Sequence, residues 1–319
     1  MTGTGSVLKV SGRATLTITD SSAAKSGTIT GGNAEYGGGV YVDDYAALKM
    51  TGGCITGCHA SRGGGGIYSS GNLYMGGTAK IEKCTGSDDA IWNRENSDIY
   101  ADGGTVDGTV NNQGTIKRSE GAAAVTVFNG TVYNRSAGTI IAGIYNGTVE
   151  NNGTISGGTF CGGVTIRKGS WVWERTGSIS GGTFYSSIVN EAGPERVTGV
   201  TFAVTFDRGD GTKTEPTPVK YNDLVPKPTA PTKSGYTFTG WEDANGAYDF
   251  NTPVTGPLTL TAKWEKVPSS GGNYYYHPTT DTKADDAKGS PKTADPGVAL
   301  YAALSLLSLT GLTCTTKKR

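Results

Sequence analysis

A unit of about 26 residues recurs through the N-terminal third of the chain. "GTITGGNAEYGGGVYV" (27–42) is followed by "GCITGCHASRGGGGIYS" (53–69) and by a weaker copy, "AKIEKCTGSDDAIWN" (79–93). Each copy holds short β-prone runs that are separated by glycine-rich turns. A period of this length predicts stacked structural repeats, in which Ile29, Ile55 and Ile81 form one inward column.

From about residue 104 the unit shortens to Gly-Thr followed by a β-branched or aromatic residue, as in "GTV" (130–132) and "GTI" (153–155). We expect the glycine in a turn, the threonine outside and the third residue inside. One coil cannot bury its apolar face alone, so coils must stack at the strand spacing of about 4.8 Å. The 51 glycines of the 319 residues fit such a turn-rich fold. The pattern predicts an all-β chain with a right-handed parallel β-helix (solenoid) over residues 1–203, with about eight coils and a length of about 40 Å.

These repeats resemble those of bacterial cell-surface right-handed β-helix proteins, whose units read G-x-I-[ST]-G-N-x-A-x-x-G-G-G-V-Y. The resemblance is close over residues 27–93 and looser over 104–200, and it implies a surface protein. The first asparagine of that unit is replaced here by Gly32, Cys58 and Cys84. Cys58 and Cys84 lie one period apart, so we expect them to stack in neighbouring coils, either as a thiol column or as a disulfide.

Parallel β-helices also carry polysaccharide lyases and hydrolases, which makes an enzyme the alternative function. A glycosidase needs two carboxylates that face one groove. The acidic pairs Asp43–Asp44 and Asp88–Asp89 are adjacent in sequence, so their side chains diverge on a strand, and we interpret them as solvated corners. The sequence has no Gly-His-Gly turn and no cluster of acidic calcium ligands. We therefore expect no catalytic residues.

The cysteines and histidines do not predict a metal site. The two histidines, His59 and His277, lie in different segments, and Cys54 and Cys58 are spaced like half of a zinc site without a partner pair. We expect neither a metal nor another cofactor. Trp171 and Trp173 share one face of a strand, where capping the last coils is favoured over stacking on sugar rings.

A second domain is predicted at residues 204–265. Its β-runs "YTFTGW" and "LTLTAKW" follow prolines at turn spacing. The order V-T-F-D, P-x-x-P-x-K-x-G-Y-T-F-x-G-W, D-F and L-T-L-x-A-K-W resembles the Listeria–Bacteroides repeat. The resemblance implies a small β-grasp-like module of bacterial surface and internalin-type proteins. Tyr236, Phe238, Trp241 and Trp264 supply enough aromatic side chains for its core.

The C-terminal region is predicted to hold the chain at a membrane or a cell wall. Residues 266–289 are poor in aliphatic side chains and read as a flexible, disordered linker. Residues 298–314 carry no charge and are just long enough for a transmembrane helix, and Lys317, Lys318 and Arg319 follow as stop charges. This order resembles the sorting signal of Gram-positive bacteria, with "SPKTA" (290–294) in the place of L-P-x-T-G. The resemblance implies recognition of Pro291 by a sortase, cleavage between Thr293 and Ala294, and linkage to peptidoglycan; a plain membrane anchor through 298–314 is the alternative.

The balance of 28 basic and 28 acidic residues argues against a nucleic-acid partner. Met1 opens directly onto "TGTGSVLKVSG" without a signal peptide, so we expect an N-terminally incomplete piece of an exported protein. The sequence predicts a non-enzymatic extracellular protein, anchored to the wall or the cell membrane, that serves adhesion or surface display. Its ligand would be a host or surface glycan or protein. A surface polysaccharide lyase or glycoside hydrolase and a purely structural spacer are the other readings.

Overall fold

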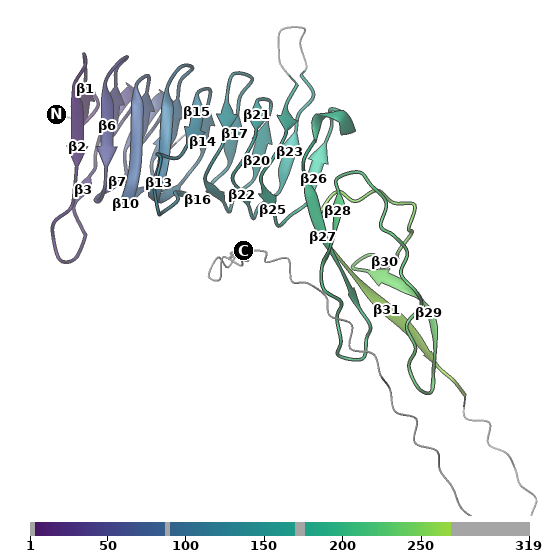
Figure 1. The fold of residues 1–319 in the computed structure, drawn as a ribbon. Coiled ribbons are helices and arrows are strands. Elements are labelled where there is room, and N and C mark those ends of the chain that lie inside the picture. Colours follow the sequence, from purple (N-terminus) through teal and green to yellow (C-terminus); the bar gives the residue numbers. More distant parts are fainter. Residues whose placement is uncertain (1–3, 87–89, 170–175, 269–319) are drawn as a thin grey trace, which may run out of the picture.

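The computed structural model describes residues 4–86, 90–169 and 176–268. These residues form a parallel β-helix followed by a small module with a mixed sheet (Figure 1). None of their helices is long and apolar enough to cross a bilayer. The expected sorting signal with Pro291, Thr293 and Ala294, the membrane segment 298–314 and nearly all of the linker lie outside the described residues.

One side of the β-helix is a sheet to which each coil contributes one short strand, and all of its pairings are parallel. Nine such strands occur in the described residues, one more than the sequence predicts. The reason is that the coils shorten along the chain: Val149 pairs with Val164, only 15 residues later. The strands are β1 (Leu8–Val10), β5 (Val40–Val42), β9 (Ile67–Ser69), β12 (Ile91–Asn93), β14 (Val110–Asn112), β17 (Val132–Asn134), β20 (Val149–Asn151), β23 (Val164–Ile166) and β26 (Ile188–Asn190).

The rest of the coil is built from two further ladders of parallel strands. Two long strands, β10 (Asn72–Glu82) and β13 (Asp98–Asp107), belong to both ladders and join them into one sheet. The first ladder also contains β2 (Thr15–Ile18), β6 (Ala47–Met50), β15 (Thr115–Lys117), β18 (Thr139–Ile140), β21 (Thr154–Ile155) and β24 (Ser178–Ile179). The second contains β3 (Thr28–Ile29), β7 (Cys54–Thr56), β16 (Val127–Phe128), β19 (Ile144–Tyr145), β22 (Thr159–Phe160) and β25 (Thr183–Phe184).

The wider N-terminal coils carry an additional sheet of three parallel strands, β4 (Asn33–Tyr36), β8 (His59–Gly63) and β11 (Thr85–Gly86). The glycine runs of the repeat let this sheet approach the neighbouring one closely. A Cβ atom on Gly38 would lie 2.3 Å from the carbonyl oxygen of His59, which no side chain tolerates. The long repeats therefore correspond to the wider coils.

The inward column expected from the 26-residue period is confirmed. Ile29 pairs with Ile55, and Ile55 pairs with Ile81. Ile55 and Ile81 are fully buried, whereas Ile29 is half-buried because its strand begins the ladder. In the short repeats the third residue of the Gly-Thr unit is likewise buried, as in Ile116, Ile140 and Ile155.

A ladder of asparagines runs through the interior beside this apolar core. Asn93, Asn112, Asn134 and Asn151 occupy equivalent positions in four successive coils and are fully buried. Each side-chain amide donates a hydrogen bond to the next side-chain carbonyl, over 2.8, 2.8 and 2.7 Å. The ladder satisfies polar groups that would otherwise be orphaned inside the β-helix.

An interior stack of aromatic rings connects the β-helix to the second domain. Phe128, Tyr145, Phe160 and Phe184 stack with centroids 5.0, 4.9 and 4.7 Å apart. Phe184 then packs edge-on against Phe202 at 6.4 Å. One continuous core therefore extends from the coils into the module.

The second domain is a mixed sheet in the order β28-β27-β31-β29-β30. Its strands are β27 (Thr201–Asp207), β28 (Thr217–Lys220), β29 (Tyr236–Asp243), β30 (Gly246–Ala247) and β31 (Leu258–Lys266), and the short 3₁₀ helix η1 (Pro194–Arg196) precedes them. The expected boundary at residue 203 falls inside β27, because this strand already pairs with β28 from Thr201 onward. Trp241 is buried between Phe206 and Phe238, whereas Tyr236 is exposed and does not contribute to the core.

Candidate functional site

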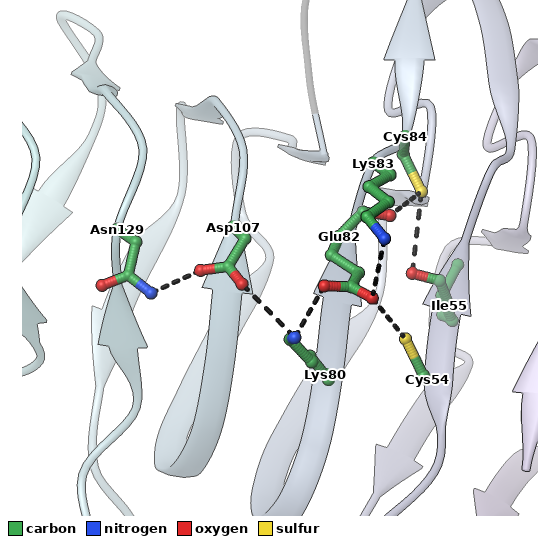
Figure 2. A network of polar contacts seen from close by, with 8 residues as sticks. All are labelled: Cys54, Ile55, Lys80, Glu82, Lys83, Cys84, Asp107 and Asn129. Carbon is green, nitrogen blue, oxygen red and sulfur yellow. Dashed lines mark hydrogen bonds and ion pairs between the residues drawn. The ribbon is translucent and has the colours of Figure 1, made fainter. Parts of the chain in front are cut away.

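A polar network on the outer face of β7, β10 and β13 is the arrangement that most resembles a catalytic site (Figure 2). The ammonium group of Lys80 lies 2.6 Å from a carboxylate oxygen of Glu82 and 3.7 Å from one of Asp107. The Cys54 thiol contacts the other oxygen of Glu82 at 4.0 Å, and Asn129 donates a hydrogen bond to Asp107. Glu82 and Asp107 are register partners in neighbouring coils. Two carboxylates thus share one lysine.

The electrostatics of this network do not suit general acid catalysis. The hydrogen bond from Lys80 lowers the pKa of Glu82, and the same contact raises the pKa of Lys80. Burial raises the pKa of the Cys54 thiol. A glycosidase needs one carboxyl whose pKa is raised, so that it is protonated at neutral pH. Glu82 is instead held as a carboxylate in an ion pair.

Cys58 and Cys84 lie one above the other at the corner between the second ladder and the three-stranded sheet. The amide of Thr85 donates to the carbonyl oxygen of Cys58 at 2.8 Å, which sets the two cysteines exactly one coil apart. Cys58 is fully buried, Cys84 is half-buried, and both are free thiols. The hydrogen bond between them lowers the pKa of Cys58 to about 6 and raises that of Cys84. Of the two arrangements that the sequence left open, the structure has the thiol pair.

Four aromatic side chains gather on the outer surface of the wider coils; we call Tyr36, Tyr41, Tyr68 and Trp92 the aromatic surface. Tyr68 lies at the centre, with its ring centroid 4.9 Å from Tyr36, 5.0 Å from Tyr41 and 6.1 Å from Trp92. The rings of Tyr36 and Trp92 are tilted by 52° and 59° against that of Tyr68, so faces and edges point in several directions. Tyr68 is buried by its neighbours, and the other three are half-buried.

The register of the repeats creates this surface. Tyr41, Tyr68 and Trp92 are partners in β5, β9 and β12, at positions that point outward between two buried residues. Tyr36 comes from β4 across the corner. Gly63 in β8 makes room for Trp92, because a Cβ atom there would lie 1.8 Å from the indole ring. The indole N–H of Trp92 is buried without a hydrogen-bond partner.

Polar groups of both charges border the aromatic surface. The Arg62 guanidinium lies 2.9 Å from the Glu35 carboxylate, and a hydrogen bond with Tyr36 raises the pKa of Arg62. Lys9 lies 3.7 Å from Asp43 on the other side. An open cleft of about 460 Å³ adjoins Tyr36 and Tyr41 and is also lined by Thr4, Gly5, Ser6, Ala34 and Glu35. Aromatic rings beside paired hydrogen-bonding groups and a cleft form a plausible ligand site.

The remaining candidates from the sequence do not converge on a site. Asp43 belongs to the ion pair with Lys9, and the His59 ring contacts the Thr85 hydroxyl at 3.3 Å. Asp88, Asp89, Trp171, Trp173 and His277 lie outside the described residues. Within residues 4–86, 90–169 and 176–268, no three histidine, cysteine or acidic side chains lie close enough together to hold a metal ion.

Sequence reasoning missed the aromatic surface, although one signal was present. Tyr41 and Tyr68 occupy the same position in the two best copies of the repeat, "GGGVYV" and "GGGIYS". Their neighbours Tyr36 and Trp92 belong to other strands and join them only through the coil register.

Comparisons with known proteins place the second domain in a family. Residues 202–263 match the Listeria-Bacteroides repeat domain, which confirms that part of the sequence-based resemblance. The chain is similar to Internalin H of Listeria monocytogenes, with 36% identity over 95 residues that cover 28% of this chain and 16% of that protein. It is also similar to a putative Gly-rich membrane protein of Evansella cellulosilytica, with 35% identity over 68 residues that cover 20% of this chain and 8% of that protein.

The chain thus covers less than a fifth of either relative. The domain match and the internalin relative together indicate a cell-surface repeat protein.

Proposed function

We propose that this protein is a non-enzymatic adhesion protein whose β-helix presents the aromatic surface to a glycan, while its C-terminus is anchored to the cell. The observation that carries the proposal is the aromatic surface itself. Tyr36, Tyr41 and Trp92 remain half-exposed on a rigid sheet, where a soluble stalk without a ligand would carry polar side chains.

The surroundings of the aromatic surface favour a neutral saccharide over a charged polymer. Lys9 is paired with Asp43, and Arg62 is paired with Glu35, so the border carries no net charge. An anionic polymer needs unpaired basic residues. A saccharide instead offers apolar C–H faces to aromatic rings and hydroxyl groups to both donors and acceptors.

The continuous core supports the role of a stalk. The amide of Ile188 in the last coil donates to the carbonyl oxygen of Thr255 in the module at 2.8 Å, and Phe184 packs on Phe202. A shared core of this kind resists hinge motion between the two domains. The β-helix would therefore hold its ligand site at a fixed distance from the module.

The C-terminal region supplies the proposed anchor. A sortase thiolate would attack the carbonyl carbon of Thr293, release the new amino terminus at Ala294 and leave a thioester. An amine of the peptidoglycan precursor would then form the final amide bond and regenerate the thiol. The flexible linker would keep "SPKTA" extended and accessible, and the segment 298–314 would hold it at the membrane.

Binding is tested with the purified chain and two neutral hexasaccharides, chitohexaose and cellohexaose, by isothermal titration calorimetry. We expect one of them to bind and Tyr41→Ala to weaken that binding about tenfold, which corresponds to about 1.4 kcal/mol. Tyr74→Ala is the matched control, because Tyr74 stacks on Tyr100 at 4.2 Å on another outer face. Equal losses in the two variants, or no binding of either sugar, would contradict the glycan assignment.

Anchoring is tested separately in a Gram-positive host that exports the full chain. Mass spectrometry of the digested wall fraction should find a C-terminal peptide that ends at Thr293, and deletion of 290–294 should abolish it. A mature surface protein that still contains "TCTTKKR" would show a plain membrane anchor instead.

The non-enzymatic assignment is supported by the ionised state of Glu82 in its pair with Lys80. Incubation with a panel of plant and bacterial polysaccharides should release neither reducing ends nor unsaturated sugars. Product formation that Glu82→Gln abolishes would establish the alternative, a polysaccharide-degrading enzyme.

A further inference from the structure

We propose that Cys58 and Cys84 are a modification site: in an oxidising environment they form a disulfide that joins two neighbouring coils beneath the aromatic surface. The inference concerns the covalent state of the chain and does not depend on the ligand of that surface.

The two sulfur atoms occupy equivalent places in successive coils. Cys58 Sγ lies 3.8 Å from the carbonyl oxygen of Ile29 and 3.6 Å from that of Thr56. Cys84 Sγ lies 3.7 Å from the carbonyl oxygen of Ile55 and 3.5 Å from that of Glu82, so the same pair of contacts recurs one coil later. Figure 2 shows the Cys84 sulfur above Ile55.

The backbone spacing suits a disulfide. Neighbouring parallel strands lie about 4.8 Å apart, and bridged cysteines have Cα atoms about 4.4–6.8 Å apart. The hydrogen bond from Thr85 to Cys58 holds the two residues at this spacing. The adjoining turns contain glycine, and the positions that Cβ atoms would take on Gly39 and Gly66 lie 3.4 and 3.3 Å from the two sulfurs. The column therefore has no side chain that separates them.

The chemistry proceeds by thiol–disulfide exchange with a small-molecule disulfide as the oxidant. Cys84 is half-buried and is the accessible thiol, whereas Cys58 is fully buried. The Cys84 thiolate attacks the small disulfide and releases one small thiol, leaving a mixed disulfide. The Cys58 thiolate then attacks Cys84 Sγ and expels the second small thiol. Two protein thiols are oxidised, one disulfide is reduced, and both protons end on the released thiols.

The position of the bridge gives it a physical consequence. The coils at the end of a repeat array unfold most readily, because they are packed on one side only. Cys58 and Cys84 immediately precede β8 and β11, and β8 contains Gly63, on which Trp92 rests. A bridge that closes this loop restricts the unfolded state and so stabilises the wider coils.

The experiment equilibrates the purified full chain with oxidised and reduced glutathione, followed by alkylation and peptide mapping without reduction. We expect a peptide that links Cys58 to Cys84 and a melting temperature several degrees above that of the reduced protein. Cys54→Ser is the matched control, because Cys54 contacts Glu82 on the outer face; this variant should form the bridge unchanged.

Cys84→Ser should remove both the linked peptide and the rise in melting temperature, while its far-UV circular dichroism stays that of the reduced protein. Complete alkylation of Cys58 and Cys84 in the most oxidising buffer would overturn the proposal. A bridge from Cys84 to Cys54, or a bridge that leaves the melting temperature unchanged, would overturn it as well. None of these outcomes bears on sugar binding or on anchoring, which have their own tests.

Discussion

Replacing Asn134 by leucine tests the interior asparagine ladder. Asn134 accepts a hydrogen bond from the amide of Asn112 at 2.8 Å and donates one to Asn151 at 2.7 Å, and it is fully buried. Leucine has a similar size but removes both bonds. It leaves one amide hydrogen of Asn112 and the side-chain carbonyl of Asn151 unpaired in the interior. Each orphaned group costs about 1–2 kcal/mol, so we expect a loss of about 3 kcal/mol.

The loss is measured as the change in the urea unfolding midpoint at constant slope, and it corresponds to a fall in melting temperature of roughly 6–12 °C. Asn146→Leu is the matched control. Its amide donates to Asn129 at 2.8 Å in a ladder of the same kind on the outer face, where water can replace the lost bond. This control should lose less than about 0.5 kcal/mol. Equal losses in the two variants would refute the argument that burial gives the interior ladder its value.

Three further changes probe other parts of the structure. Ile55→Asp buries an unpaired carboxylate in the column between Ile29 and Ile81, so unfolding should become easier by more than about 3 kcal/mol; an unchanged melting curve would contradict its burial. Tyr145→Phe keeps the ring stack but removes the hydroxyl that donates to the carbonyl oxygen of Ala142 at 2.6 Å, and should cost about 1 kcal/mol in chemical unfolding. The pKa of Glu82 is lowered in the folded state, so its contribution to stability is present above its ordinary pKa and disappears as the pH falls through the lowered value. Melting temperatures of the protein and of Glu82→Gln should therefore differ at neutral pH and converge below about pH 3; a constant difference would show that the ion pair is not responsible.

The columns of the β-helix could be predicted from the sequence because the repeat period fixes them directly. Ile29, Ile55 and Ile81 stack as their spacing predicts. The number of coils was underestimated because the later coils shorten, and Gly-Thr units alone do not show which of them share a coil. Once each coil holds as few as 15 residues, two units fall on one turn, as Ile155 and Phe160 do on two ladders.

The asparagine ladder was visible in the sequence only in retrospect. "IWN", "VNN", "VYN" and "VEN" each place a buried apolar residue two positions before an asparagine. Asparagine is ordinarily a turn residue, so its pattern was hidden among the glycine-rich corners. The aromatic surface could not be predicted either, because Tyr36 and Trp92 meet Tyr68 only when β4, β9 and β12 assume their places around the corner.

Labelling of intact cells with a membrane-impermeant amine reagent tests the central claim most directly. Lys83 on the β-helix and Lys213 in the module have side chains that are 79% and 61% exposed. If the protein is displayed at the cell surface, both lysines will be modified in intact cells to the same extent as in a lysate. Modification that appears only after lysis would place the chain inside the cell and would contradict surface display, and with it the proposed adhesion.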